Sequence, residues 1–176
     1  LFGEADFEGK LPVTFYRTME ELPEFTDYSM KNRTYRYMKN EALYPFGYGL
    51  SYTKFEYENT VLIEDADHVD IKTIIKNTGK MDGTETVQVY VKAEHSKMPH
   101  GQLKKIVKLP LCAGEEKEIN IRLESEAFML YDENGEKILP SGHFEIFVGG
   151  MQPDSRSEKL TGKTMESLML NNCASL

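Results

Sequence analysis

The chain has 176 residues, 40% of them hydrophobic and 11% aromatic, which suffices for one ordinary domain with a core and some flanking segments. Its 29 acidic and 21 basic residues give a net charge of -8, and the lysines are scattered, so nucleic acid is excluded as an expected partner. No apolar run is long enough to cross a membrane, so no membrane partner is expected either.

The two cysteines, Cys112 and Cys173, lie far apart and show no paired spacing. Neither a zinc site nor a disulfide framework is therefore expected, and both thiols are predicted to be free. Free thiols favour the cytoplasm. The chain opens with LFGEADFEGK, which has no initiating Met and no secretory signal, so it reads as cut from a longer protein whose secretion stays open.

Residues 1–42 show short apolar patches broken by Gly9, Pro12 and Pro23, without a helical period. Two strands are predicted here, GKLPVTFYR at 9–17 and RTYRYM at 33–38. Because two strands cannot form a stable domain, this segment is interpreted as the tail of a domain that precedes residue 1.

Residues 54–150 alternate between apolar and polar side chains and are divided by turn signals such as NTGKMDG at 77–83 and Asn134-Gly135. Strands are predicted at 68–77, 84–93, 103–111 and 115–123, in the two arms of 128–139, and at 143–150. The expected inward residues are Val69, Ile71, Thr73, Ile75, Val87, Val89, Val91, Ile119, Ile121, Leu123, Phe144, Ile146 and Val148. The fold class predicted is mainly β, with a seven-stranded fibronectin type III-like (immunoglobulin-like) β-sandwich; the lack of tryptophan disfavours a true immunoglobulin domain.

Residues 151–176 are polar at first and then carry Met165, Leu168, Met169 and Leu170. A short packing tail is predicted, and the alternative is a partner-binding helix with an apolar stripe barely one turn wide.

No chemistry-bearing motif emerges from the polar residues. The acids considered for paired-carboxylate chemistry are Glu20, Glu21, Glu24, Asp27, Glu41, Asp65, Asp67, Asp132 and Glu133, and they are interpreted as solvated surface groups. The four histidines, His68, His95, His100 and His143, lack metal-ligand spacing, although His95 and His100 flank a loop that could cover something. P-loop, Rossmann and nucleophile-elbow motifs are absent, so no cofactor and no metal are expected.

Several stretches together resemble the carboxy-terminal part of glycoside hydrolase family 3. They are GKLPVTFY at 9–16, DYSMKNRTYRY at 27–37, LYPFGYGLSYTKF at 43–55, NTGKMDGTETVQVYV at 77–91, LKKIVKLPLCAGEEKEINIRL at 103–123 and GHFEIFVGG at 142–150. The resemblance implies a parent enzyme with a barrel, an α/β sandwich domain and a fibronectin type III-like domain. It places the end of the α/β sandwich domain at 1–42, an aromatic interdomain crossing at 43–53, the fibronectin-like domain at 54–150 and a carboxy-terminal tail at 151–176.

The resemblance also implies the function: a retaining, exo-acting β-glucosidase or β-xylosidase that cleaves plant-type oligosaccharides or aryl β-glycosides. The aspartate nucleophile and glutamate acid/base are expected upstream of this chain, so no catalytic residue is assigned and the chain alone is predicted to be inactive. Arg33, Tyr35 and Arg36 could face a sugar, or could simply cover the domain surface.

Two other classes stay open on the sequence. A carbohydrate-binding or adhesion module would need exposed aromatics on the sandwich, where Tyr90 is the chief outward candidate. A scaffold would dock intramolecularly onto the barrel and α/β sandwich domains, or support a homodimer. The stretch at 43–55 has no acid or histidine, and its side chains Tyr44, Phe46, Tyr48, Tyr52 and Phe55 are predicted to fill an interdomain seam.

Overall fold

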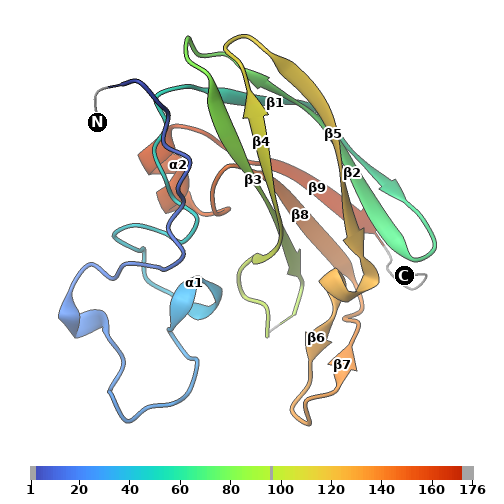
Figure 1. The fold of residues 1–176 in the computed structure, drawn as a ribbon. Coiled ribbons are helices and arrows are strands. Elements are labelled where there is room, and N and C mark those ends of the chain that lie inside the picture. The colour runs from blue at the N-terminus through green and yellow to red at the C-terminus, as the bar shows by residue number, and fades with distance from the viewer. Residues whose placement is uncertain (1–2, 96, 172–176) are drawn as a thin grey trace.

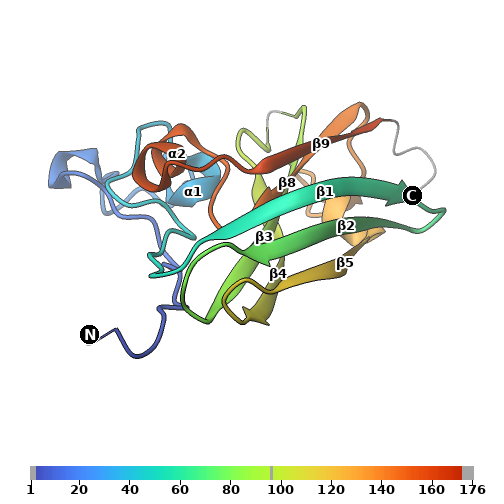
Figure 2. The ribbon, with the colours of Figure 1, turned by 90° about the horizontal axis from the view of Figure 1, so that it is seen from above.

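A computed structural model describes residues 3–95 and 97–171, which form a β-sandwich of two antiparallel sheets with a long amino-terminal segment laid against it (Figure 1). One sheet has the order β1-β2-β5, from β1 (Phe55–Glu64), β2 (His68–Asn77) and β5 (Glu116–Glu124). The other has the order β4-β3-β8-β9, from β4 (Gln102–Leu111), β3 (Gly83–Ala93), β8 (His143–Gly149) and β9 (Glu166–Asn171). Seen from above, the two sheets face each other as separate layers (Figure 2). The prediction of a mainly β sandwich is confirmed.

The core lies between the sheets and includes the apolar side chains that the alternation assigned inward, together with others such as Phe128 and Leu170. All three of Val69, Ile71 and Ile75 on β2 are fully buried, and they pack against the β3 valines and the apolar residues of β8. Phe128 and Phe144 meet edge-to-face with their ring centroids 5.2 Å apart. The period-2 pattern predicted this face because successive side chains of a strand point to opposite sides of its sheet.

The sandwich has seven strands, but two of them differ from those expected. The hairpin at 128–139 forms only the short strands β6 (Leu130–Tyr131) and β7 (Lys137–Ile138), which pair in a small sheet of their own. β1 and β9 take their places in the main sheets. The hairpin turn itself is confirmed, with Gly135 at φ 82° and the Asp132 carboxylate accepting from the backbone N–H groups of Asn134 and Glu136.

A β-bulge explains why β1 is hard to recognise. The register against β2 shifts between Glu58 and Val61, where Asn59 has φ 53°. Residues before the bulge face the core at odd positions and residues after it at even positions, so no single alternation runs through the strand. Val61 and Ile63 consequently point outward and are about half exposed.

Residues 3–54 contain little regular structure: a 3-10 turn at Met19–Glu21, the short helix α1 at Thr34–Tyr37, and one bridge between Phe15 and Tyr44. The strand predicted at 33–38 is wrong, because Asn32 (φ 57°) and Thr34 (φ 53°) adopt left-handed backbone conformations that turn the chain into α1. Of the strand predicted at 9–17, only that single bridge forms. Antiparallel backbone hydrogen bonds to residues 43–48 accompany it.

This amino-terminal segment lies across the outer face of the β4-β3-β8-β9 sheet. Glu8 is held there by the hydroxyls of Thr84 and Thr86 and by the Lys108 ammonium, which donates to its carbonyl at 2.9 Å. As a result β3 is buried on both faces, and Tyr90 has no exposed surface. Tyr90 does point away from the core as the alternation required, but the segment covers it.

Within the predicted packing tail, residues 151–171 form a second helix and a strand, and Leu168 and Leu170 pack against the core. Helix α2 (Ser155–Thr161) begins with the Asp154 carboxylate accepting from the Ser157 N–H and ends at Gly162, which has φ 67°. β9 then pairs with β8 and extends the sheet beyond residue 150. The division into domains at 42, 53 and 150 stays a prediction, and Cys173 lies outside the described residues.

The described residues were compared with the requirements of a membrane-spanning helix and of a metal site. Within them, no helix has the length and apolar character needed to span a membrane, and no group of three or more acidic, cysteine or histidine side chains is arranged to hold a metal ion. The Cys112 thiol is exposed and free.

Candidate functional site

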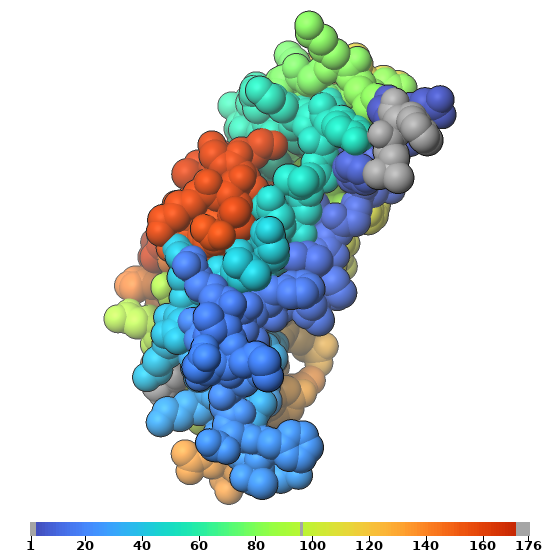
Figure 3. Space-filling view, turned by 90° about the vertical axis from the view of Figure 1, so that its left-hand side faces the viewer, coloured from blue at the N-terminus to red at the C-terminus, as the bar shows by residue number. Residues whose placement is uncertain are grey.

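The aromatic stretch at 43–55 forms a seam between the amino-terminal segment and the sandwich (Figure 3). The Phe46 ring stacks on Tyr35 of α1 with centroids 4.3 Å apart, and Tyr35 meets Tyr90 of β3 edge-on at 6.2 Å. Tyr44 stacks on Tyr48 at 5.7 Å. Phe46 and Tyr35 thus join α1 to the outer face of the sheet, whereas Tyr44 and Tyr52 are 42% and 52% exposed. That the whole stretch fills an interdomain seam stays a prediction.

Gln88 of β3 is the polar centre of this seam. Its side chain is 2% exposed, and its amide nitrogen donates to the carbonyls of Gly47 and Gly150, each at 3.0 Å. The Tyr90 hydroxyl donates to the Gln88 amide oxygen at 2.7 Å, and burial raises the pKa of that tyrosine. Gly47 has φ 76° and lies so close that a Cβ there would collide with the Gln88 amide oxygen and come within 2.9 Å of the Tyr90 hydroxyl.

A second buried polar group lies at the other end of the seam, beside a groove of about 600 Å³. The Tyr57 hydroxyl donates to the Glu85 carboxylate at 2.9 Å, and the Lys10 ammonium donates to the Gly49 carbonyl at 3.3 Å. Burial raises the pKa of Tyr57, with Glu85 adding to the shift, and burial lowers the pKa of Lys10. The first bond ties β1 to β3, and the second ties the segment around residue 10 to the loop around residue 49.

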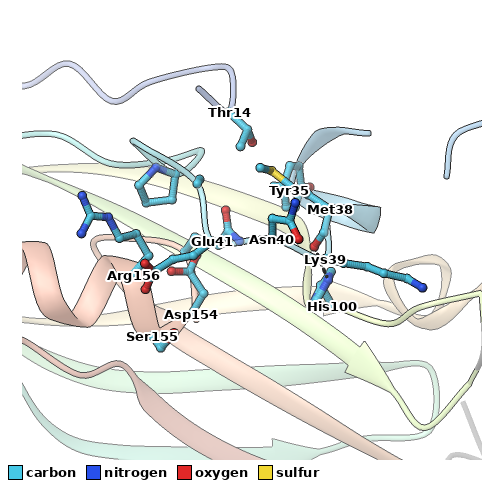
Figure 4. Close-up of a pocket in the computed structure, with 13 residues that line it drawn as sticks. Thr14, Tyr35, Met38, Lys39, Asn40, Glu41, His100, Asp154, Ser155 and Arg156 are labelled. Carbon is cyan, nitrogen blue, oxygen red and sulfur yellow. Dashed lines mark hydrogen bonds between the residues drawn. The ribbon is translucent and has the colours of Figure 1, made fainter. Parts of the chain in front are cut away.

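A polar cavity of about 210 Å³ lies where the seam, α1 and the start of α2 meet (Figure 4). Thr14, Tyr35 and Met38 form one wall, and Asp154 and Arg156 face them from the start of α2. Thirteen residues line the cavity: Thr14, Tyr35, Met38, Lys39, Asn40, Glu41, Ala42, Pro45, His100, Gln152, Asp154, Ser155 and Arg156.

Two charged side chains at the cavity rim, Glu41 and Arg156, are engaged with other groups of the chain. The Glu41 carboxylate pairs with Arg17 and with the Lys159 ammonium at 2.7 Å, which lowers the pKa of Glu41. The Arg156 guanidinium donates to the Leu43 carbonyl at 3.2 and 3.3 Å.

The three residues considered for sugar contact make internal bonds instead. The Arg33 guanidinium donates to three backbone carbonyls of its own loop, and Arg36 donates to the Gln102 side chain at 2.9 Å. The Tyr35 hydroxyl accepts from the Leu103 N–H at 3.1 Å. Only Tyr35 of the three also lines the cavity. Whether any of them contacts a sugar stays a prediction.

The histidines and acids are dispersed over the surface. One His100 ring nitrogen lies 2.9 Å from the Met38 carbonyl at the cavity, so this loop does meet the amino-terminal segment. His68 instead bonds Asp67 on the turn before β2, which raises the pKa of that imidazole. Asp132 bonds its own turn, and Asp27 accepts from the Ser29 N–H. Glu41 and Asp154 do line one cavity together, but Glu41 is paired with Arg17 and Lys159, and Asp154 caps helix α2.

The fold defines a class of protein region: a fibronectin type III-like sandwich whose outer sheet face is covered by a long amino-terminal segment. Two family models match the chain in this order, "Glycosyl hydrolase family 3 C-terminal domain" at residues 1–52 and "Fibronectin type III-like domain" at residues 85–152.

Curated relatives match almost the whole chain. A xylan 1,4-β-xylosidase of Xylanibacter ruminicola is 38% identical over 92% of this chain and 19% of its own length. A thermostable β-glucosidase B of Acetivibrio thermocellus is 34% identical over 88% of this chain and 23% of its own length. The crystal structure of a β-glucosidase from Kluyveromyces marxianus superposes with a TM-score of 0.79, at 28% identity, over 97% of this chain and 22% of that one.

The chain therefore spans about a fifth of the length of the relatives it matches. It belongs to glycoside hydrolase family 3, of which it represents the carboxy-terminal region.

Proposed function

We propose that this chain is the carboxy-terminal, non-catalytic part of a retaining, exo-acting β-glucosidase or β-xylosidase that acts on plant-type oligosaccharides. The observation that carries this proposal is the match to β-xylosidases and β-glucosidases over nearly the entire chain. The catalytic aspartate and glutamate then belong to the rest of the protein, and this part contributes structure.

The distribution of exposed apolar side chains supports docking onto the rest of that protein. Among the described residues, twelve of the seventeen exposed large apolar side chains lie at positions 7–52, although this segment is less than a third of the chain. Phe25 and Tyr28 are 93% and 90% exposed, and Met19 is 83% exposed. A surface this apolar is typical of an interface. The barrel and α/β sandwich domains are the proposed occupants.

An assay of the isolated chain tests the non-catalytic part of the proposal. Residues 1–176, purified to homogeneity, should release no nitrophenol from p-nitrophenyl β-D-glucoside or β-D-xyloside. Turnover that follows the protein through every purification step would overturn the assignment of catalysis to other domains.

An assay of the longer protein tests the reaction itself. Protein that includes the domains upstream of residue 1 should hydrolyse at least one of the two glycosides, and NMR should show that the first sugar released keeps the β configuration. Failure to cleave either glycoside, or release of the α anomer, would refute the proposed activity.

The binding-module alternative is less well supported. Exposed large apolar side chains on the described strands are Val61, Ile63, Ile106, Tyr131 and Met169. Only one of them is aromatic, whereas a planar sugar-binding face needs two or three. Saturable binding of xylan or cellooligosaccharides by this chain, at the exposed sandwich surface, would revive the alternative.

Assembly of the longer protein is a separate prediction. A homodimer would appear as twice the monomer mass in light scattering of that protein, and a single monomeric species would exclude it.

A further inference from the structure

The cavity of Figure 4 contains buried hydrogen-bonding atoms that lack partners. Three buried side-chain oxygens have no hydrogen-bond partner among the described residues, and two of the three, Gln152 Oε1 and Thr14 Oγ1, belong to residues that line this one cavity. Gln152 is 9% exposed. Buried polar atoms are almost always hydrogen-bonded, so two unsatisfied oxygens on one cavity indicate an occupant that supplies donors.

The charges around the cavity indicate that this occupant is neutral. Glu41 is already paired with Arg17 and Lys159, and Arg156 is bonded to the Leu43 carbonyl. A charged occupant would therefore compete with these existing partners. Lys39 also lines the cavity, but its side chain extends away from the other lining residues (Figure 4). The oxygens without partners belong to the Gln152 amide and the Thr14 hydroxyl, and both can hydrogen-bond to alcohol groups.

The Asp154 carboxyl group also lines the cavity and can likewise hydrogen-bond to alcohol groups. One of its oxygens accepts from the Ser157 N–H at 2.7 Å, and burial raises the pKa of the carboxyl group. Tyr35, Met38 and Pro45 supply apolar walls between these polar atoms. Apolar walls with a few placed polar groups are typical of a small-molecule site.

Size restricts the occupant further. A cavity of about 150 Å³ accepts a benzene ring, and a water molecule takes about 30 Å³ of liquid volume. The 210 Å³ here therefore holds one six-membered ring with its hydroxyl groups.

We propose that this cavity is a binding site for a neutral polyhydroxylated molecule the size of a monosaccharide, held by Gln152 and Thr14. The site is built from the amino-terminal segment and the start of α2, so an occupied cavity links these two segments.

NMR titration of the ¹⁵N-labelled chain 1–176 tests the site, with D-xylose, D-glucose, glycerol and D-glucuronate as probes. Both neutral sugars should give saturable shifts confined to amides that line the cavity, with dissociation constants in the millimolar range. Glycerol should bind more weakly because it fills less of the volume, and glucuronate more weakly because it is charged. No saturable shift with either sugar, shifts centred elsewhere, or equal binding of glucuronate would overturn the proposal.

Two variants connect the binding to the named oxygens. Gln152→Leu and Thr14→Val each remove one hydrogen-bonding group while keeping most of the side-chain volume, and each should weaken sugar binding about tenfold. Thr60→Val is the matched control, because Thr60 bonds Thr73 between β1 and β2, away from the cavity. Should Gln152→Leu fail to fold, Thr14→Val carries the test alone. Unchanged affinity in a folded Thr14→Val chain would refute the site.

The outcome is independent of the proposed glycosidase activity. Binding is read on this chain, whereas hydrolysis is read on the longer protein.

Discussion

Alanine substitutions at Gly47 and Gly114 should distinguish the cost of backbone strain from the cost of a steric clash in the seam. Gly47 and Gly114 have nearly the same left-handed backbone, with φ of 76° and 78°. An alanine in this conformation costs about 1–2 kcal/mol at either position. A Cβ at Gly114 meets no atom within 4 Å, whereas a Cβ at Gly47 meets the Gln88 amide and the Tyr90 hydroxyl.

Gly47→Ala should therefore destabilise the chain more than Gly114→Ala. The Gln88 side chain would have to move, which breaks its bonds to Gly47 and Gly150 and leaves buried groups unpaired. Each such group costs about 1–3 kcal/mol, so we expect the Gly47 variant to lose about 1–3 kcal/mol beyond the Gly114 variant.

Urea unfolding of both variants, followed by far-ultraviolet circular dichroism and tyrosine fluorescence, measures this difference. The same comparison in a Gln88→Ala background should show a smaller difference, because the nearest colliding side chain is gone and only the Tyr90 hydroxyl remains close. Equal losses in the original background would refute the role assigned to Gln88.

Three further predictions concern other parts of the chain. Tyr57→Phe should lower the free energy of unfolding by about 1–3 kcal/mol, measured in urea, because it removes the donor to buried Glu85. Arg122 lowers the pKa of Asp70 from 3.8 to about 2, so the stability that this pair supplies is present above pH 4 and is lost as the pH falls toward 2. As the pH falls from 4 toward 2, the melting temperature of the Asp70→Asn variant should therefore approach that of the original chain. A difference in melting temperature that stays constant with pH would contradict this prediction. Phe25→Ser should reduce self-association and the binding of an apolar dye without changing the melting temperature, since Phe25 is 93% exposed.

Sequence periodicity predicted the sandwich well where strands alternate without interruption. On β2 and β8 every second residue is buried, and the apolar ones among them belong to the core. Alternation failed at β1, where the bulge at Asn59 changes which positions face inward. Alternation placed Tyr90 on the outer face correctly but could not show that this face is covered, because a pattern within one strand says nothing of distant segments.

Local propensity misled the reading of residues 33–38. Thr34 and Tyr35 favour strands, yet the positive φ angles at Asn32 and Thr34 turn this stretch into α1, where Tyr35 reaches Phe46. The polar cavity could not be predicted either, since Thr14, His100 and Gln152 come from three separate parts of the chain. Nothing in their local sequence connects them.

The covered outer face of β3 has a consequence for biosynthesis. The hydrogen bonds that hold this face join residues far apart in the sequence. The separation is 41 residues between Gly47 and Gln88, 100 between Glu8 and Lys108, and 118 between Glu41 and Lys159. During synthesis from the amino terminus, the aromatic stretch at 43–55 leaves the ribosome long before the strands that bury it. Contacts of such long sequence separation form slowly, and exposed apolar segments aggregate meanwhile. The nascent chain thus carries its most aromatic segment unprotected until β3 and α2 have been made, which makes this segment the place where a chaperone would bind.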